Sequence, residues 1–149
     1  ASFINDSLNL QRVKNTSSSQ YRVVLNLLAR KSAQDFYTQR LLGNYSVDEI
    51  DDHHIFPVKS GLKIPDEKVD CILNRTLLCT ETNKKIQNQT PKAYYDEILK
   101  KIGDESKVNA IMQSHFISDG AIARLKENDF EGFTFSLKSP ALRVRMQEQ

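Results

Sequence analysis

Asp51-Asp52-His53-His54-Ile55-Phe56-Pro57 is the stretch from which the organisation of this chain can be worked out. Two of the three histidines in 149 residues stand side by side in it, directly behind two carboxylates. Asn74 and then Asn83 follow further along the chain. The order His, Asn, Asn indicates a strand that ends at the histidines, a second strand, and a helix that carries the last asparagine.

The residues around these positions support that reading. Pro57 is expected to end the histidine strand, and residues 58–70, with a glycine, a proline and several charges, predict a loop. Residues 71–79 are rich in aliphatic and β-branched side chains and predict the second strand. Thr80 is expected to cap a short helix that contains Asn83.

The pattern resembles the HNH nucleases, whose core is a β-hairpin crossed by one helix around a divalent metal. It is most similar to the C-terminal HNH domain of GmrSD-type modification-dependent restriction proteins, which also carry a ParB-like NTPase domain. The resemblance spans roughly residues 21–133. It is carried by four runs: Val24 to Phe36, Asp-His-His-Ile-Phe-Pro ending at Pro57, Asn-Arg-Thr-Leu-Leu from Asn74, and Asn-Lys-Lys-Ile-x-Asn-x-x-Pro from Asn83.

The fold class that follows is α+β and mainly helical. We expect a polar lead-in at 1–20 and a single HNH nuclease domain at 21–149. Its ββα-metal core of a β-hairpin and a metal-binding helix should lie at about 49–90, surrounded by additional helices at 21–42 and 91–149.

Apolar spacing and helix signals place those additional helices. The pattern that starts at Tyr21 runs through Phe36 to Leu41 at helical intervals. Thr90-Pro91 is a typical start for a helix that would end at Gly103. Residues 104–116 predict a further helix with His115 as a core or helix-end residue. The tail is expected to form one or two more helices, broken near Gly132 and Pro140.

The resemblance implies a role for each residue of the pattern. His54 corresponds to the general base, a natural role for a neutral imidazole near pH 7. His53 and Asn83 correspond to metal ligands, and Asn74 to the asparagine that binds backbone across the loop and fixes the catalytic histidine. Such a sparse ligand set suits Mg²⁺ best, with Mn²⁺ or Ni²⁺ as alternatives.

Strand geometry adds a candidate and raises a difficulty. Neighbouring side chains on a regular strand point to opposite faces, yet both histidines must reach one phosphate. The strand should therefore bend or end here. The same alternation places Asp51 on the side of His53, either as a third ligand or as the acceptor for a ring N–H.

Three cations near the pattern are candidates for contacts with nucleic acid. Lys84 and Lys85 follow Asn83 at the start of a helix, where backbone N–H groups also favour phosphate. Arg75 is a weaker candidate. Each of the three is equally compatible with an ordinary solvated side chain.

The composition limits the remaining possibilities. With 39% hydrophobic and 27% charged residues, the chain is typical of a soluble globular domain. It has neither an 18-residue apolar run nor a signal-peptide pattern, so we expect a cytoplasmic location and no membrane contact. The net charge of +2 means that any attraction to DNA must be local. Cys71 and Cys79 are expected to be buried free thiols.

These observations favour a metal-dependent DNA endonuclease, the cleavage module of a modification-dependent restriction or anti-phage defence protein. Its expected partners are DNA and an N-terminal NTPase or sensor domain of the same protein. The main alternative is a catalytically inactive HNH-fold module that binds DNA or a protein partner. A purely helical interaction module would require the 50–91 segment to lack a hairpin, and RNA stays open as a substrate.

Overall fold

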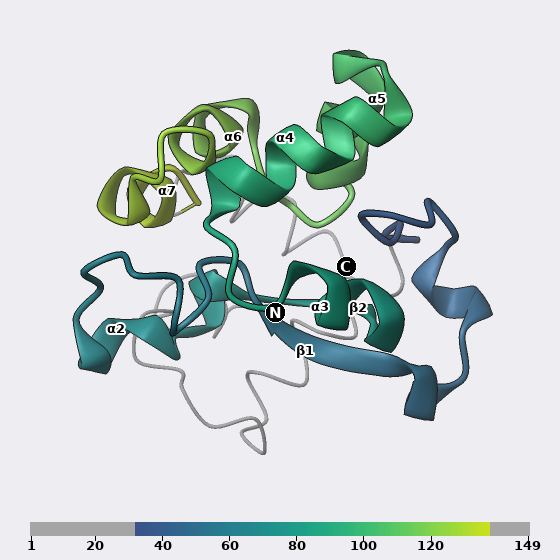
Figure 1. Ribbon diagram of the computed structural model, residues 1–149, viewed down its shortest axis with the longest axis horizontal. Helices are drawn as coiled ribbons and strands as arrows, with labels where there is room; N and C mark the ends of the chain where they lie inside the picture. Colours follow the sequence, from purple (N-terminus) through teal and green to yellow (C-terminus); the bar gives the residue numbers. More distant parts are fainter. Residues whose placement is uncertain (1–31, 138–149) are drawn as a thin grey trace, which may run out of the picture.

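The computed structural model describes residues 32–137, which form a mainly helical α+β fold (Figure 1). The described part contains six α-helices and a two-stranded antiparallel hairpin. The predicted lead-in at 1–20, the first part of the helix predicted at 21–42, and Pro140 lie outside the described residues.

The elements follow one another in a simple order. The hairpin consists of β1 (Ile50–His54) and β2 (Arg75–Cys79). The helices are α2 (Asp66–Val69), α3 (Thr80–Ile86), α4 (Pro91–Ile102), α5 (Glu105–Gln113), α6 (Asp119–Leu125) and α7 (Phe130–Leu137). Short 3-10 turns lie at Leu42–Asn44, Val47–Glu49 and Ile72–Asn74.

The hairpin at 50–79 excludes the purely helical alternative. In its antiparallel register, His53 stands opposite Thr76 and His54 opposite Arg75. β2 runs directly into α3, which packs back onto both strands. Figure 1 shows the hairpin, α2 and α3 in one layer, with α4 to α7 forming a second layer over it.

Side chains from the helical layer hold the end of the histidine strand. The Tyr94 hydroxyl of α4 donates a hydrogen bond of 2.6 Å to the carbonyl of Ile55. The ring of Phe56 packs against Phe130 and Phe133 of α7. The two residues that directly follow the histidines are therefore buried in the core between the layers.

The predicted helix start at Thr90-Pro91 and its end at Gly103 are confirmed. The Thr90 side chain accepts a hydrogen bond from the N–H of Ala93, and Pro91 is the first helical residue. Gly103 follows the helix with φ of 75°, a left-handed conformation that glycine adopts without steric cost. These signals are local, so the sequence alone suffices to place this helix.

The helix predicted at 21–42 does not continue into the described part. Residues 33–41 form a turn in which Gln34 bridges to Leu41. The Asp35 carboxylate accepts the backbone N–H groups of Tyr37 and Thr38, and Gln39 has φ of 64°. An aspartate that binds nearby N–H groups offers the backbone a turn in place of a helix.

Three further boundaries differ from the prediction around the hairpin. The segment 58–70 contains the short helix α2. The second strand begins at Arg75 rather than at residue 71, because residues 72–74 form a buried 3-10 turn. Thr80 is the first residue of α3 and not its cap, since its hydroxyl binds Asp51 across the hairpin.

The break predicted near Gly132 is also wrong, since Gly132 lies inside α7. The chain turns earlier, where Asn128 has φ of 58° between α6 and α7. The Asp129 carboxylate accepts the N–H of Gly132 and lies where a Cβ would project. The glycine is therefore the residue that leaves room for this cap.

The structure also bears on the cysteines and on a membrane-spanning helix. Both cysteines are buried, as predicted. None of the helices in residues 32–137 has the length and apolar character needed to cross a membrane.

Candidate active site

The alternation of β1 divides the predicted site residues between the two faces of the hairpin. Asp51 and His53 meet α3, where their partners are Thr80 and Asn83. Asp52 and His54 lie on the other face, with partners in β2 and at the end of α2. The histidines therefore have separate environments.

His53 and Asn83 form a direct pair. Nδ1 of His53 lies 2.9 Å from Oδ1 of Asn83, and Nδ2 of Asn83 donates to a carboxylate oxygen of Asp51 at 3.2 Å. Because a carboxylate can only accept, Asp51 fixes the orientation of the Asn83 amide. The amide oxygen then faces His53, whose Nδ1 carries the hydrogen in this arrangement.

His53 is almost fully buried, with 2% of its surface exposed. Its ring packs edge-on against the rings of Phe36 and Tyr94. Burial lowers the pKa of His53 to about 4, so the ring is neutral near pH 7. Nε2 has no hydrogen-bond partner within residues 32–137. His53 is thus a neutral imidazole with unused capacity for an interaction.

His53 and Asn83 offer one nitrogen and one oxygen donor for a small divalent cation. The 2.9 Å between Nδ1 and Oδ1 is the length of their hydrogen bond, and it is also close to the separation of about 3 Å between adjacent ligands of such an ion. Binding would replace this hydrogen bond and move the His53 hydrogen to Nε2, which has no partner within residues 32–137. The protein would supply few ligands, because the described chain has no group of three or more His, Cys, Asp or Glu side chains placed to hold a metal.

Asp51 supports this pair. One of its oxygens accepts from the Thr80 hydroxyl at 3.0 Å and the other from the Asn83 amide. Both oxygens are therefore engaged. Of the two roles predicted for Asp51, the structure favours the supporting one, although its acceptor bond goes to Asn83 and not to a histidine ring.

His54 pairs with a residue that the sequence did not indicate. Its Nε2 lies 2.7 Å from Oδ1 of Asp70, the residue that directly follows α2. The His54 side chain is 26% exposed and that of Asp70 is 49% exposed. Because the carboxylate accepts, Nε2 carries the hydrogen and Nδ1 is the unprotonated nitrogen of the neutral ring.

Asn74 is fully buried and joins three segments of backbone. Its Oδ1 accepts the N–H of Phe56 at 2.7 Å, and its Nδ2 donates to the carbonyls of Phe56 and Val69 at 3.1 and 2.8 Å. The Asn74 carbonyl also accepts the N–H of Ile55. These are cross-loop contacts of the kind that the resemblance implies, and a part of Asn74 in catalysis stays a prediction.

Both histidines open onto one cleft of about 360 Å³ at the end of the hairpin. β1 ends at His54, so the ring nearest the strand end and the buried ring beside Asn83 reach the same hollow. The lining residues are Asp52, His53, His54, Pro57, Val58, Lys59, Asn83, Gln87 and Asn88. Neighbouring side chains of a regular strand point to opposite faces, but the two histidines can reach one cleft because the strand ends at His54.

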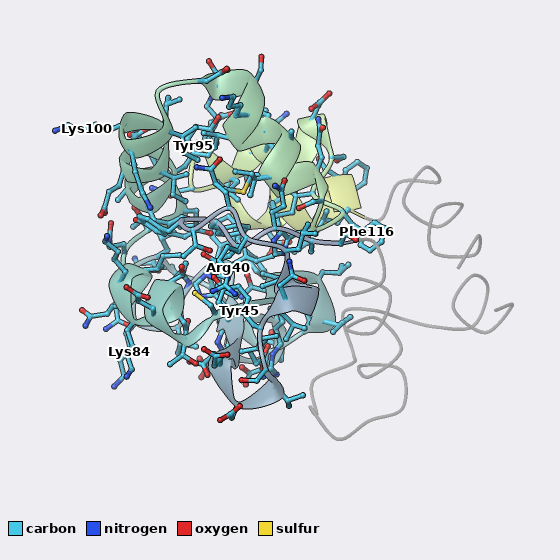
Figure 2. The ribbon with its side chains drawn as sticks, turned by 90° about the vertical axis from the view of Figure 1, so that its right-hand side faces the viewer. Arg40, Tyr45, Lys84, Tyr95, Lys100 and Phe116 are labelled. Carbon is cyan, nitrogen blue, oxygen red and sulfur yellow. The ribbon has the colours of Figure 1, made fainter. Side chains whose placement is uncertain are left out.

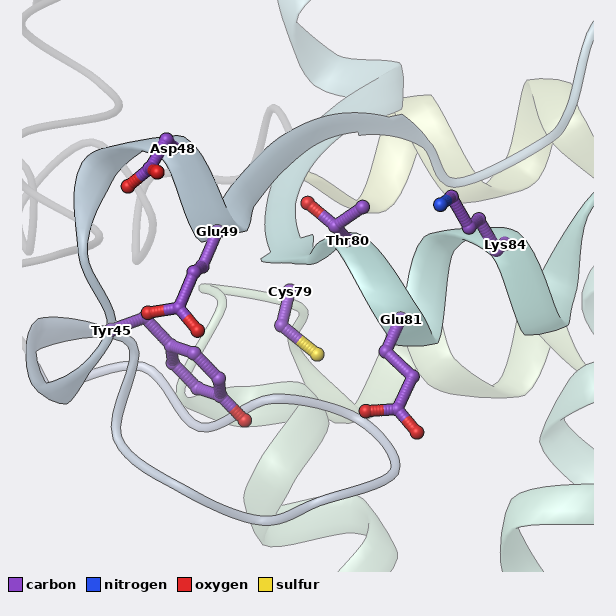
Figure 3. Close-up of a pocket in the computed structure, with 7 residues that line it drawn as sticks. All are labelled: Tyr45, Asp48, Glu49, Cys79, Thr80, Glu81 and Lys84. Carbon is purple, nitrogen blue, oxygen red and sulfur yellow. The ribbon is translucent and has the colours of Figure 1, made fainter.

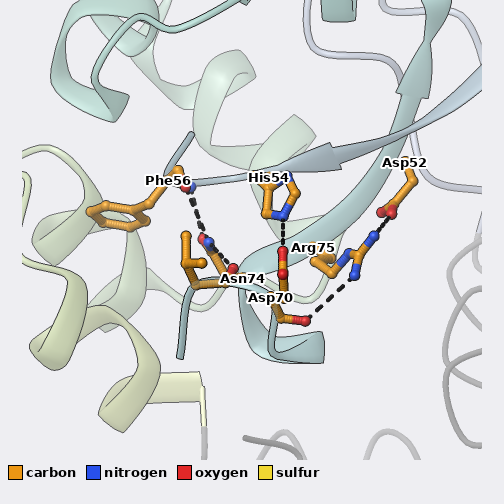
Figure 4. A network of polar contacts seen from close by, with 7 residues as sticks. Asp52, His54, Phe56, Asp70, Asn74 and Arg75 are labelled. Carbon is orange, nitrogen blue, oxygen red and sulfur yellow. Dashed lines mark hydrogen bonds and ion pairs between the residues drawn. The ribbon is translucent and has the colours of Figure 1, made fainter. Parts of the chain in front are cut away.

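The three predicted nucleic-acid contacts do not line this cleft. Arg75 is only 9% exposed and donates to the Asp52 carboxylate and the Asp70 carbonyl (Figure 4). Lys84 projects outward from α3 (Figure 2), and the Lys85 ammonium lies over the ring of Tyr37. The cation that does line the cleft is Lys59, which lies in the segment predicted as a loop and carries no signal in the sequence that sets it apart from its charged neighbours.

Lys84 belongs to a second hollow of about 400 Å³ near the start of β1 (Figure 3). Its lining residues are Tyr45, Asp48, Glu49, Cys79, Thr80, Glu81 and Lys84. Three of these are carboxylates, and no histidine is among them. This hollow is therefore a poor place for a phosphate.

The third histidine is structural, as predicted. His115 is buried and donates from Nε2 to the carbonyl of Gln34, while Nδ1 accepts from the Thr76 hydroxyl, each at 2.7 Å. Burial lowers its pKa to about 4. His115 thus joins α5's end, β2 and the 33–41 turn as a neutral ring.

Comparisons with known proteins leave the family open. No family model and no solved structure matches this chain. An uncharacterized protein from the archaeon Methanocaldococcus jannaschii is 34% identical over 132 residues, which cover 81% of this chain and 22% of that protein. The chain therefore spans about a fifth of the relative's length.

Proposed function

We propose that this chain is a metal-dependent nuclease domain of the HNH type, which hydrolyses phosphodiester bonds in DNA. The observation that carries the proposal is the cleft that both histidines line, each with its own polar partner. The hairpin followed by α3 has the element order of a ββα-metal core. The two histidine–partner pairs supply a base and a pair of metal ligands at one place.

His54 takes the role of general base. Its Nε2 hydrogen is directed to Asp70, so Nδ1 is the nitrogen that accepts a proton from the attacking water. Its partial exposure gives water access to the ring. A neutral imidazole is suited to proton transfer near pH 7.

His53 and Asn83 would hold a divalent cation, Mg²⁺ or alternatively Mn²⁺ or Ni²⁺. Such a cation, when bound, stabilises the negative charge that develops on the phosphate and the leaving oxygen. The surroundings are acidic, since Asp51, Asp52 and Asp70 lie around the histidines. Without a cation, these carboxylates would repel a phosphate.

The DNA backbone is expected to enter the cleft beside Lys59. This lysine has no ion pair with any other residue of the described part, and it shares the cleft with both histidines. Gln87 and Asn88, which directly follow α3, also line this cleft. Their amides can donate hydrogen bonds to phosphate or sugar oxygens.

The wider setting extends the same proposal. A cleavage module of this kind fits a cytoplasmic restriction or anti-phage defence protein, with an NTPase or sensor domain N-terminal to it. The share of the archaeal relative that this chain covers leaves room for such a domain in that protein.

The test is nicking of supercoiled plasmid with Mg²⁺ or Mn²⁺, compared with the same reaction in a chelator. The wild-type chain should nick only with metal. His54→Ala should lower the rate by about two orders of magnitude or more, as expected for loss of a general base. Lys100→Ala on α4 is the control and should nick at the wild-type rate.

The alternative is an HNH-fold module that binds DNA or a protein without cutting it. The sparse set of protein ligands favours this alternative. It would be supported by metal-dependent DNA binding with no nicking under any metal. Cleavage of single-stranded RNA in place of plasmid DNA would keep the mechanism and change the substrate.

A further inference from the structure

Asp70 has no role in the sequence pattern, yet it makes the closest polar contact of His54 (Figure 4). Its carboxylate lies 2.7 Å from Nε2, and the two residues are 16 positions apart in the sequence. Half of the Asp70 side chain is exposed to solvent. A pair with this much exposure contributes little to the stability of the fold, because solvent screens it.

The backbone on both sides of Asp70 is nevertheless held firmly. Nδ2 of the buried Asn74 donates to the carbonyl of Val69, directly before Asp70. Nη1 of Arg75 donates to the carbonyl of Asp70 itself at 3.5 Å. The position of the segment that carries the carboxylate is therefore set by Asn74 and by Arg75, the first residue of β2.

The same two residues also position His54. Arg75 stands opposite His54 in the hairpin register, and Asn74 binds the backbone of Phe56 on the far side of the histidine. Figure 4 shows His54 and Asp70 facing each other between these contacts. Asn74 and Arg75 thus hold the backbone around both His54 and Asp70.

We propose that Asp70 is a positioning residue that holds the His54 ring in one tautomer and one orientation. This inference rests on the proposed role of His54 as the base. With Nε2–H bound to the carboxylate, the unprotonated Nδ1 is left to accept a proton from an attacking water. Without Asp70 the hydrogen can occupy either nitrogen, and the ring can turn about its side-chain bonds.

Asp52 lies on the same face of β1 as His54, but it is directed to Arg75. The guanidinium binds its Oδ2, while its Oδ1 has no hydrogen-bond partner within the described residues and makes no bond to His54. Asp70 is therefore the carboxylate that orients the His54 ring. Substitution of a group that orients a metal-binding histidine costs about 10- to 100-fold, and we expect a loss of the same order for the base.

The first test reads the His54 ring directly in the metal-free protein at neutral pH. Long-range proton–nitrogen NMR correlations distinguish the protonated from the unprotonated ring nitrogen. The wild type should show hydrogen on Nε2 alone, and Asp70→Ala should show a mixture of both tautomers. Asp66→Asn, at the exposed start of α2, should retain the wild-type spectrum.

The second test separates positioning from folding and binding. Asp70→Ala should lower kcat for plasmid nicking by about 10- to 100-fold, with KM and the melting temperature near the wild-type values. Asp70→Asn keeps an acceptor oxygen, so it should keep the Nε2–H tautomer and recover part of the rate.

The results distinguish failure of the proposed nuclease function from failure of the role of Asp70. If the wild type never cuts nucleic acid, the proposed function fails, while the tautomer measurement still decides what Asp70 does to His54. If the wild type cuts and His54→Ala does not, but Asp70→Ala retains both the rate and the single tautomer, the inference alone is overturned.

Discussion

His53 and His54 are neighbours in the chain, but their ring nitrogens meet different partners. His53 is buried against aromatic rings and bound to Asn83 of α3, whereas His54 is partly exposed and bound to Asp70. A buried, neutral ring beside an amide oxygen suits metal coordination. A ring with access to water suits proton transfer, so single substitutions should separate the two roles.

Removal of either proposed ligand should weaken metal binding. His53→Ala and Asn83→Ala are each expected to lower the affinity for Mn²⁺ by at least about tenfold, since loss of an orienting partner alone costs that much. Higher metal concentration should restore part of their nicking. His54→Ala should bind Mn²⁺ like the wild type and stay inactive at any metal concentration.

Titration calorimetry with Mn²⁺ measures these affinities. Equal affinities in all three variants would show that His53 and Asn83 are not the ligands.

His115 should make stability depend on pH. Its pKa in the folded protein is about 4, below the ordinary value of 6.5, because burial disfavours the charged ring. The unfolded chain therefore binds a proton more readily, and the contribution of His115 to stability is lost as the pH falls from 6.5 towards 4. Between pH 7 and 5, the wild type should lose about 2 kcal/mol more than His115→Gln.

Urea unfolding at a series of pH values gives this difference. The variant itself should be less stable than the wild type at pH 7, because the bonds to Thr76 and Gln34 are disturbed. Parallel stability curves for the two proteins would show that His115 is not a buried neutral ring.

At the scale of elements, the 33–41 turn is joined to the start of α3 through one carboxylate. Asp35 is fully buried and accepts hydrogen bonds from the N–H groups of Tyr37, Thr38 and Cys79 and from the Thr82 hydroxyl. Burial by itself would raise the pKa of Asp35. The hydrogen bonds outweigh that effect and hold the pKa below its ordinary value. Asp35 thus fixes the helix that carries Asn83.

Asp35→Asn should destabilise the protein substantially. An asparagine keeps one acceptor oxygen and turns an NH₂ group towards donors, so several buried hydrogen bonds are lost. We expect a loss of about 3 kcal/mol in the free energy of unfolding at pH 7. Asp96→Asn, in an exposed ion pair with Lys92, should change it by less than about 1 kcal/mol.

Chemical denaturation of the three proteins checks this expectation. The difference between wild type and Asp35→Asn should also shrink as the pH falls through the lowered pKa of Asp35, since the ionised form makes the bonds. Similar losses for both variants would mean that Asp35 does not hold the turn to α3.

At the scale of the whole molecule, the distribution of charge matters more than its sum. The net charge is only +2, and the lysines of α3 face away from the histidine cleft or lie over Tyr37. Lys59 is the cation that shares the cleft with both histidines. Binding of DNA should therefore depend on the position of a lysine and not merely on its charge.

Lys59→Ala and Lys84→Ala form a matched pair that tests this dependence. Both remove one positive charge, but only Lys59 lies in the cleft. In a His54→Ala background, which does not cut, Lys59→Ala should reduce the slope of log affinity against log salt for duplex DNA by about 0.9. Lys84→Ala should leave the slope near the starting value.

Fluorescence anisotropy at several salt concentrations gives both slopes. A larger change for Lys84→Ala would move the DNA path from the cleft to the outer side of α3.

The chain by itself should cut DNA with little selectivity. It has no tryptophan, its five glycines are scattered, and nothing in the cleft resembles a pocket for a flipped base. It also spans only 22% of its archaeal relative, so recognition can lie in other parts of such a protein. Modified and unmodified plasmids should be nicked at similar rates, and a strong preference for either would place recognition within these residues.

The sequence alone determined the features that depend on near neighbours. The Thr90-Pro91 start and the Gly103 end of α4 are encoded by a cap and a turn residue within a few positions, and the strand that ends at the histidines by its own strand-forming residues. Such signals need no knowledge of the rest of the chain. The meeting of His53 with Asn83, 30 residues apart, was expected from the resemblance to HNH nucleases and not from local signals.

Only the tertiary structure decided which polar groups meet over longer distances. His54 and Asp70 are 16 residues apart, and Asp35 reaches Cys79 over 44 residues. The same is true of exposure: Lys59 lines the cleft, whereas Lys84 and Lys85 do not, although all three read alike in the sequence. A side chain's partners and its access to water depend on how α2, α3 and the loops pack on the hairpin. That packing is set by the buried core as a whole, so the sequence next to each of these residues does not indicate its partners or its exposure.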